Sequence, residues 1–336
     1  MRQTYVSFLR KFLAVAGMFA ALVGSVQAVP TLTAAAITDG FSLSLFADGF
    51  PVSSCCGPLG IAFAGGGKVM VSDGPGNVRI FATDTDGQSA GAAPVAANFG
   101  GFNAIGLARV GNFVYMTLQT TGAVSRLNLD GTFNSGVVSG IPTATGIYAN
   151  PVTGKLYVSD CCSNTGIWVV DPVTNTSSKF KASGSYDGLS ISADGLTIYA
   201  ELGQHIIGYR LSDGVQVFDS GFISGADGTE LGAGTLAGQI FVNTNNGELW
   251  EVSLASSIQK RLVFGGTRGD FVTADPNGSL LFTQTSDIRR LTAPAGGCIG
   301  VACNQVPEPS SLALIALGLL GLAHSTTTIR RRSAAR

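Results

Sequence analysis

Between residues 59 and 294, short apolar runs alternate with polar turns, and one order of elements recurs six times. Each unit has an apolar strand that begins at or near glycine, a turn, a second strand that ends in small polar residues, and a third strand. The spacing of about forty residues is typical of a four-stranded propeller blade. The six units are residues 59–84, 105–131, 145–172, 187–214, 231–254 and 270–294.

Turn residues between the first and second strands support this division. Asp194-Gly195 and Asn277-Gly278 supply the positive φ that tight hairpins need, and Pro151 fixes φ at the start of a turn. A β-sandwich or a solenoid with irregular spacing is the alternative fold.

A fourth strand is weaker in each unit, and the sixth unit lacks one. The candidates are residues 95–99, 137–139, 177–181, 215–219 and 259–264. Residues 41–46 (FSLSLF) precede the first unit and belong to none, so we expect them to supply the outer strand of the sixth. That pairing would close the ring and remove its free edges. The prediction is an all-β, six-bladed β-propeller over residues 29–294, closed by an N-terminal strand.

The layout of these units resembles the NHL-type and gluconolactonase-like six-bladed propellers. No unit carries the Trp-Asp dipeptide of another propeller class. The resemblance is one of architecture, so it transfers no catalytic residue.

The N-terminus has the three parts of a secretory signal peptide. Arg2, Arg10 and Lys11 precede an apolar stretch over residues 12–23, and Val26-Gln27-Ala28 offers a small-x-small cleavage site. Residues 1–28 are therefore expected to be removed by signal peptidase.

The C-terminus carries a second targeting signal. Pro307, Glu308 and Pro309 are followed by an apolar run over residues 312–323, which is shorter than the roughly 20 residues of a full membrane span. A basic cluster comes next, formed by Arg330, Arg331 and Arg332. Residues 306–336 thus resemble the PEP-CTERM sorting signal of Gram-negative bacteria, with residues 295–305 as a cysteine-containing linker.

This resemblance implies recognition by an exosortase, transient membrane association through the C-terminal helix, and release to the cell surface or an exopolysaccharide matrix. Whether the tail is cleaved or kept as an anchor stays open. Residues 29–309 carry 13 Lys and Arg against 21 Asp and Glu. This part of the chain therefore lacks the excess of basic residues that is typical of nucleic-acid binding.

Six cysteines in an exported chain favour disulfides. They are Cys55, Cys56, Cys161, Cys162, Cys298 and Cys303. The last two are expected to close a small loop before the sorting signal. Bonds between the two doublets would have to cross the mouth of the channel, and bonds within each doublet or a zinc or copper site of four thiolates are the alternatives.

The order of strands assigns acidic residues to two faces. One face holds the loops that enter each first strand, and the other holds turns where carboxylates are expected to cap backbone N–H groups. The acids of the first face are Asp73, Asp160, Asp187, Glu201, Asp227, Glu230 and Asp270. Those of the second are Asp84, Asp86, Asp130, Asp171, Asp194, Asp213 and Asp275.

The first face supplies the candidate binding site at the mouth of the channel, formed by Asn103, Tyr186, Asp187, Glu230 and Asp270. The ring of Tyr186 is expected to be exposed, where it would stack on a sugar. The carboxylates of Asp187, Glu230 and Asp270 offer oxygens of the kind that Ca²⁺ prefers. In gluconolactonase-like propellers a metal lies there, held by Glu, Asn and Asp. The alternative is that these carboxylates bond to backbone N–H groups around a solvated channel.

Hydrolytic chemistry of the Ser-His-Asp type is disfavoured, because the chain has two histidines and no GxSxG motif. The favoured function is an exported, non-catalytic module that binds a glycan or a protein at the cell surface. The alternatives are a metal-dependent, lactonase- or lyase-like hydrolase at the acidic face, and a purely structural component.

Overall fold

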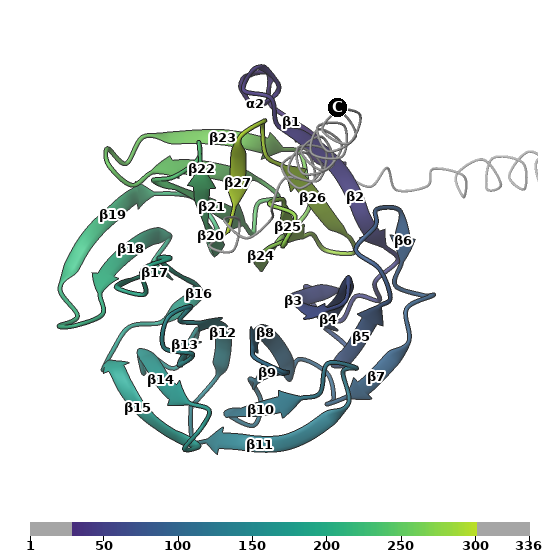
Figure 1. Ribbon diagram of the computed structural model, residues 1–336, viewed down its shortest axis with the longest axis vertical. Helices are drawn as coiled ribbons and strands as arrows, with labels where there is room; N and C mark the ends of the chain where they lie inside the picture. The colour runs from purple at the N-terminus through teal and green to yellow at the C-terminus, as the bar shows by residue number, and fades with distance from the viewer. Residues whose placement is uncertain (1–28, 301–336) are drawn as a thin grey trace, which may run out of the picture.

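The computed structural model describes residues 29–300, which form six sheets around a central axis (Figure 1). The predicted six-bladed, all-β propeller is therefore confirmed. The strands of blades one to four run outward from the axis in chain order. Blade one has β3 (Pro58–Gly65), β4 (Lys68–Asp73), β5 (Asn77–Phe81) and β7 (Val95–Asn98).

Blade two has β8 (Ala104–Val110), β9 (Phe113–Leu118), β10 (Ala123–Leu127) and β11 (Phe133–Ser139). Blade three has β12 (Ala144–Ala149), β13 (Leu156–Asp160), β14 (Ile167–Asp171) and β15 (Thr176–Lys181). Blade four has β16 (Tyr186–Ile191), β17 (Thr197–Leu202), β18 (His205–Arg210) and β19 (Gln216–Phe222).

Blades five and six carry extra strands. Blade five has β20 (Ala226–Gly234), β21 (Gln239–Thr244), β22 (Leu249–Ser253) and β23 (Gln259–Phe264), with β1 (Thr31–Leu32) outside and β27 (Gly297–Ile299) inside. Blade six has β24 (Val272–Ala274), β25 (Leu280–Thr283), β26 (Ile288–Thr292), β2 (Ser42–Asp48) and β6 (Gln88–Ser89). A short helix, α2 (Ala34–Thr38), links β1 to β2 and is capped by Thr33.

The N-terminal strand β2 pairs antiparallel with β26, in the place where the sequence analysis expected residues 41–46. A strap from blade one, formed by residues 82–94, lies outside it, and its β6 pairs in parallel with the end of β2. The outer strand of blade six is thus covered on both edges.

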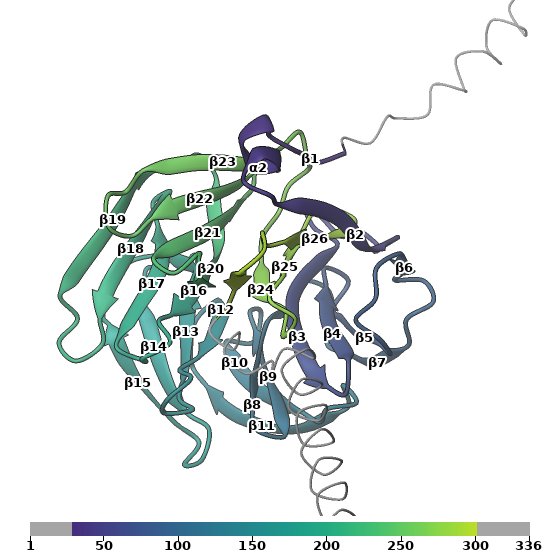
Figure 2. The same cartoon turned by 45° about the horizontal axis from the view of Figure 1, so that its top comes forward.

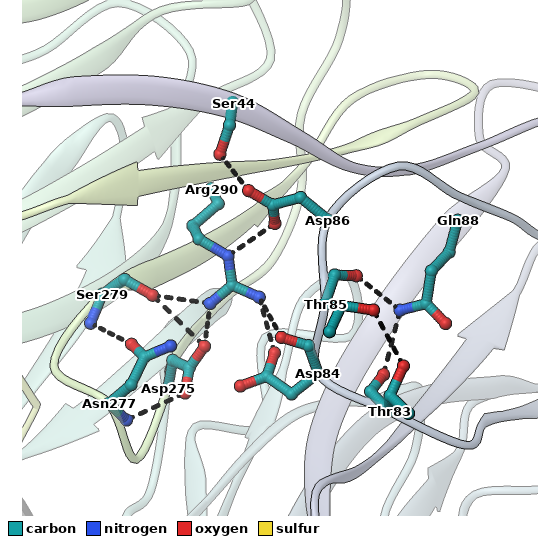
Figure 3. Close-up of polar contacts among 10 residues, drawn as sticks. All are labelled: Ser44, Thr83, Asp84, Thr85, Asp86, Gln88, Asp275, Asn277, Ser279 and Arg290. Atoms are coloured by element: carbon teal, nitrogen blue, oxygen red, sulfur yellow. Dashed lines mark hydrogen bonds and ion pairs between the residues drawn. The ribbon is translucent and has the colours of Figure 1, made fainter.

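Arg290 of β26 ties this closure together (Figure 3). Its guanidinium bonds to Asp84 and Asp86 of the strap and to Asp275 and Ser279 of blade six. Asp86 also accepts a hydrogen bond from Ser44 of β2, at 2.5 Å. We call Arg290, Asp84, Asp86 and Asp275 the latch. The four residues join two segments that lie far apart in the chain, the strap that follows β5 and the strands of blade six.

The innermost strands pack closely because blades one to five have glycine as the third residue of the first strand. A Cβ at Gly60, Gly146 or Gly188 would overlap a backbone carbonyl of the next blade. A β-bulge lies at this point in each of the five strands. The glycines therefore allow a narrow ring around the channel.

Two faces follow from the path of the chain. The entry face holds the loops that enter the first strands and those between second and third strands, and the turn face holds the other turns (Figure 2). Residues 297–299 form β27 on the turn-face end of β20, so part of the expected linker is a strand of blade five. No helix within residues 29–300 has the length and apolar character to cross a membrane.

Candidate functional site

A ring of six side chains surrounds the channel at the entry face. In blades one to five the ring residue is the one before the glycine that stands third in the first strand. In blade six it is Asp270, whose carbonyl lies against Gly228. The members in blade order are Leu59, Ile105, Thr145, Asp187, Asp227 and Asp270. The ring is therefore apolar or neutral over blades one to three and acidic over blades four to six.

The apolar half packs against a disulfide. Cys56, Leu59 and Ile105 form one buried cluster, with Cys55, Phe102 and other partly buried side chains against it. Cys55 and Cys56 are bonded to each other. This half of the mouth presents sulfur and aromatic surface rather than charge.

Among residues 29–300, Arg268 is the cation that acts on the acidic half of the ring. Arg268 donates two hydrogen bonds to one oxygen of Asp270, at 3.0 and 2.6 Å, and its side chain is 39% exposed. The enclosed Oδ1 atoms of Asp187 and Asp227 have no hydrogen-bond partner within residues 29–300. We call Asp187, Asp227, Asp270 and Arg268 the acidic mouth.

Burial and mutual repulsion hold protons on these groups. Burial, with the charges of Asp270 and Glu201, raises the pKa of Asp187 to about 8. Burial, with the charges of Asp187 and Asp270, raises the pKa of Asp227 well above its usual range. The pKa of Asp270 is also raised by burial, against the opposing effect of Arg268. The mouth thus carries more acidic groups than its cation neutralises.

Two amide oxygens extend the set of unused acceptors. Asn243 of β21 donates from Nδ2 to the carbonyls of Phe271 and Thr283, and its enclosed Oδ1 accepts nothing within the described chain. The enclosed Oδ1 of Asn245, in the following loop, has no donor there either. Four oxygens on the entry-face side of blades four and five therefore lack donors.

The structure changes the place of three predicted site residues. Tyr186 is only 2% exposed, and its hydroxyl lies 3.1 Å from that of Tyr209, so the expectation of an exposed ring is wrong. Asn103 is 8% exposed and accepts hydrogen bonds from the backbone of Thr120 and Thr121, which makes it a loop cap. Only Asp187 and Asp270 of the predicted set lie together.

Glu230 was expected at the same mouth, and this is wrong. Blade five begins at Ala226 rather than at residue 231, so Glu230 lies deeper in the channel. Its Oε1 accepts from the hydroxyl of Tyr148, at 2.9 Å, and from Leu231 N, and its Oε2 accepts from Ala274 N. Burial raises the pKa of Glu230 to about 7, although these bonds act in the opposite direction. The Glu230 carboxylate therefore links blades three, five and six across the channel.

A cavity of about 340 Å³ opens from this level toward the turn face. Its walls are mostly apolar side chains and backbone of all six first strands, and Arg109, Tyr148 and Glu230 supply polar groups. Ile299 of β27 lines it as well. The cavity and the acidic mouth are separate ends of one channel.

The cysteine doublets are both internal disulfides, Cys55–Cys56 and Cys161–Cys162. The alternatives of bonds across the mouth and of a four-thiolate metal site are therefore overturned. Cys161 Sγ accepts from Gln119 Nε2 at 3.3 Å, so the second doublet is also held at the entry face. Cys298 takes part in a disulfide, and Cys303 lies outside the described residues.

The residues that could hold a metal ion differ from the expected Asp187, Glu230 and Asp270. Within residues 29–300, no three His, Cys, Asp or Glu side chains are arranged as a metal site. Asp270 is engaged by Arg268, and Glu230 lies elsewhere. The oxygens that remain come from Asp187, Asp227, Asn243 and Asn245, which are donor atoms of the kind that hard cations take.

Sequence reasoning left Asp227, Arg268 and Asn243 out of the predicted site. A signal for Asp227 was present, because Ala226-Asp227-Gly228 repeats the Tyr186-Asp187-Gly188 pattern of blade four. No comparable repeat marks Arg268, which stands in an irregular loop before β24.

The structure is similar to known propellers. A gluconolactonase from Xanthomonas campestris matches with a TM-score of 0.60 and 16% identity, over 79% of this chain and 95% of that one. A luciferin-regenerating enzyme matches with a TM-score of 0.62 and 11% identity, over 77% and 97%. A chain of the nidogen/laminin complex matches with a TM-score of 0.56 and 14% identity, over 69% and 97%. At these identities the likeness concerns the fold alone.

No curated protein sequence matches the chain. Residues 305–332 match the PEP-CTERM protein-sorting motif, which includes Pro307, Glu308, Pro309 and the cluster Arg330, Arg331 and Arg332. The structure of these residues lies outside the described range, as does that of the predicted signal peptide. The motif implies processing by an exosortase and export toward the cell surface. The chain therefore combines a six-bladed propeller with a C-terminal PEP-CTERM sorting motif.

Proposed function

We propose that this protein is a non-catalytic binding module of the cell surface or its matrix, and that its ligand is a glycan or protein held at the acidic mouth. One observation carries the proposal: the enclosed oxygens of Asp187, Asp227, Asn243 and Asn245 have no donors within the described chain. Unsatisfied buried acceptors are costly, and they are retained where something else satisfies them.

The chemistry of the ligand follows from these atoms. Four acceptors and an excess of acid favour hydroxyl, amine or guanidinium groups, as in the hydroxyls or free amines of a sugar or the basic side chains of a protein. In the apolar half of the ring, the partly buried side chains of Cys55 and Phe102 supply a surface for the uncharged face of the same ligand. A two-sided mouth of this kind suits an amphipathic surface such as a pyranose ring.

The test is a glycan array and a matrix pull-down with the mature protein. We expect retention by the wild type at a pH near 9, where Asp187 has lost its proton, and a loss of at least about tenfold in affinity for Asp187→Asn combined with Asp227→Asn, because an amide cannot supply a charge-assisted bond. Asp171→Asn, on an exposed turn of the other face, is the matched control. Failure of the wild type to retain any glycan or matrix protein would refute the proposal.

The second candidate is a metal-dependent hydrolase of the lactonase type at the same face. The four donor-free oxygens are ligand atoms of the kind that a hard cation takes, and such a cation would polarise a carbonyl when bound. Elemental analysis for Ca²⁺ and Zn²⁺, followed by lactone hydrolysis assays on Asp187→Ala and Asp270→Ala, tests it. Absence of both metal and turnover in the mature wild type rejects this candidate and leaves the binding module.

A further inference from the structure

The cavity at the turn-face end of the channel contains a buried acid, Glu230, that no cation of the described chain balances. Glu230 is 2% exposed and forms part of the cavity wall. Its hydrogen bonds come from neutral donors, namely the hydroxyl of Tyr148 and the backbone N–H groups of Leu231 and Ala274. Within residues 29–300, no lysine, arginine or histidine acts on its pKa. The ionised carboxylate therefore lacks the partner that a buried charge requires.

The other polar side chains of the cavity leave this role to Glu230. Tyr148 keeps its proton, because burial and the charge of Glu230 raise the pKa of its hydroxyl well above the usual range. Asp275 also lines the cavity, but it is engaged by Arg290 within the latch. Arg109 is exposed near the end of β8, where its guanidinium donates to two backbone carbonyls. Glu230 is therefore the group of this cavity that can attract a cation.

The cavity has the size and the walls of a site for a small organic molecule. Its volume of about 340 Å³ lies at the lower end of the range for such sites. Apolar and aromatic residues from several blades and from β27 line it, among them Phe63, Tyr148, Leu189, Val272 and Ile299. Walls of this kind cannot replace the water shell of an inorganic ion, whereas they suit a cation that carries an apolar body.

The cavity opens away from the acidic mouth. Pro151 and Pro276, which follow β12 and β24 in turns of the turn face, line its outer end. Toward the entry face, the hydrogen bonds of Glu230 to blades three and six cross the channel. A ligand in the cavity and a ligand at the acidic mouth would therefore occupy separate places.

We propose that this cavity is a second ligand site, which takes a small amine with an apolar body and pairs its ammonium group with Glu230. The ammonium group would donate to Glu230 Oε2, which within the described chain accepts from Ala274 N alone, at 3.3 Å. The apolar body would displace water from the apolar walls. The site is independent of the ligand proposed for the acidic mouth.

The experiment measures the binding of 2-phenylethylamine and of 2-phenylethanol to the full chain by calorimetry. The two probes have the same shape, and an ammonium group in the first replaces a hydroxyl group in the second. At a pH near 8, Glu230 with its pKa of about 7 is mostly ionised, while the amine is protonated. We expect the amine to bind at least about tenfold more tightly at this pH, because its hydrogen bond is charge-assisted. At about pH 5.5, where Glu230 holds a proton, this preference should be lost.

Three variants separate the cavity from the acidic mouth and from a general effect on folding. Asp187→Asn combined with Asp227→Asn removes the charges of the mouth that could also hold an amine, and the preference should remain. Adding Glu230→Gln to this pair keeps the shape of the side chain and should abolish the preference. Tyr148→Phe removes a donor to the carboxylate and raises the pKa of Glu230 further, so the preference should appear at higher pH than in the wild type.

Equal melting temperatures verify that the variants fold. A wild type that does not prefer the amine near pH 8 would overturn the proposal. So would a preference that is lost with the charges of the mouth, or one that survives the addition of Glu230→Gln. If the chain with Glu230→Gln does not fold, the Tyr148→Phe variant decides, and an unchanged pH dependence in that variant would overturn the proposal.

Discussion

The latch and the acidic mouth have the same composition, three aspartates around one arginine, at opposite faces of the propeller. In the latch, Arg290 is 6% exposed and donates five hydrogen bonds, three of which reach carboxylates of Asp84, Asp86 and Asp275. In the acidic mouth, Arg268 reaches Asp270 alone. The same charges thus form a completed network in one place and an incomplete one in the other.

The difference separates a structural cluster from a candidate binding site. A buried charged network stabilises a fold only when its members are fully bonded, and each unbonded member is a liability. The latch meets this condition and holds the ring closed. The acidic mouth does not meet this condition, because Asp187 and Asp227 keep oxygens that have no donor within the described chain. Such oxygens are expected where a ligand supplies the missing donors.

The largest expected effect is that of Arg290→Met. Removing the guanidinium leaves three carboxylates without their cation, two of them at side chains at most 19% exposed, and we expect a loss of about 3–5 kcal/mol in the free energy of unfolding. Arg268→Met is the matched control and should lose about 1 kcal/mol or less, since that arginine is partly solvated. Urea unfolding measures both, and equal losses would contradict the distinction.

The second test replaces one carboxylate of each cluster by its isosteric amide. Asp275→Asn should lose about 2 kcal/mol, because Asp275 accepts from Arg290, from Ser279 and from the backbone of Asn277. Asp227→Asn should gain about 1 kcal/mol at a pH near 9, because burial raises the pKa of Asp227 while the unfolded wild type ionises this carboxyl group freely at that pH. Losses in both variants would show that the mouth is as complete as the latch.

Much of the fold could be predicted because each blade repeats the same alternation of apolar residues and the same turn chemistry. The strap β6 and the strand β27 could not, since each pairs over two or three residues and leaves no periodic signal. Their pairing depends on tertiary position alone. The latch was missed for the same reason, and its acids were expected only to cap turns.

The candidate site was predicted in part, and the errors lie at the starts of the first strands. In blade four the expectation for Tyr186 came from its place beside Asp187, but Tyr186 already pairs with Leu202 as the first residue of β16, and the register shifts only after it, between Tyr186 and Leu189. In blade five the first strand starts five residues before the predicted unit, which placed Glu230 at the mouth instead of Asp227. The sequence repeats predict where the blades lie. The exact start of each first strand and its β-bulge determine which side chains face the channel, and neither leaves a signal in the repeats.

The third prediction concerns pH. Asp187, with a pKa near 8, and Asp227 keep protons in the folded protein that the unfolded chain releases near pH 4. Stability contributed by these groups is therefore present at low pH and is lost as the pH rises from about 4 to about 8. We expect the free energy of unfolding to fall by at least about 1 kcal/mol between pH 5 and pH 8.

Variants of the latch and of the acidic mouth should change the dependence of stability on pH over different pH ranges. The pKa of Asp84 in the latch is raised to about 6 by burial, so Asp84→Asn should flatten the profile below that value. Asp187→Asn and Asp227→Asn should flatten it at higher pH. A wild-type stability that rises steadily from pH 5 to pH 8 would contradict the raised pKa values of both clusters.

The smallest effect is expected beside the mouth, at Tyr186. Its hydroxyl lies 3.1 Å from that of Tyr209 in the core of blade four, and its ring packs edge-on against that residue at 6.2 Å. Tyr186→Phe keeps the ring and removes one neutral hydrogen bond, so a loss of about 0.5–1 kcal/mol in stability is expected. Ligand retention should be unchanged, in contrast to Asp187→Asn one residue along the chain. If Tyr186→Phe weakened retention as strongly as Asp187→Asn, the boundary of the mouth would have to include this buried ring, and charge alone would not define the site.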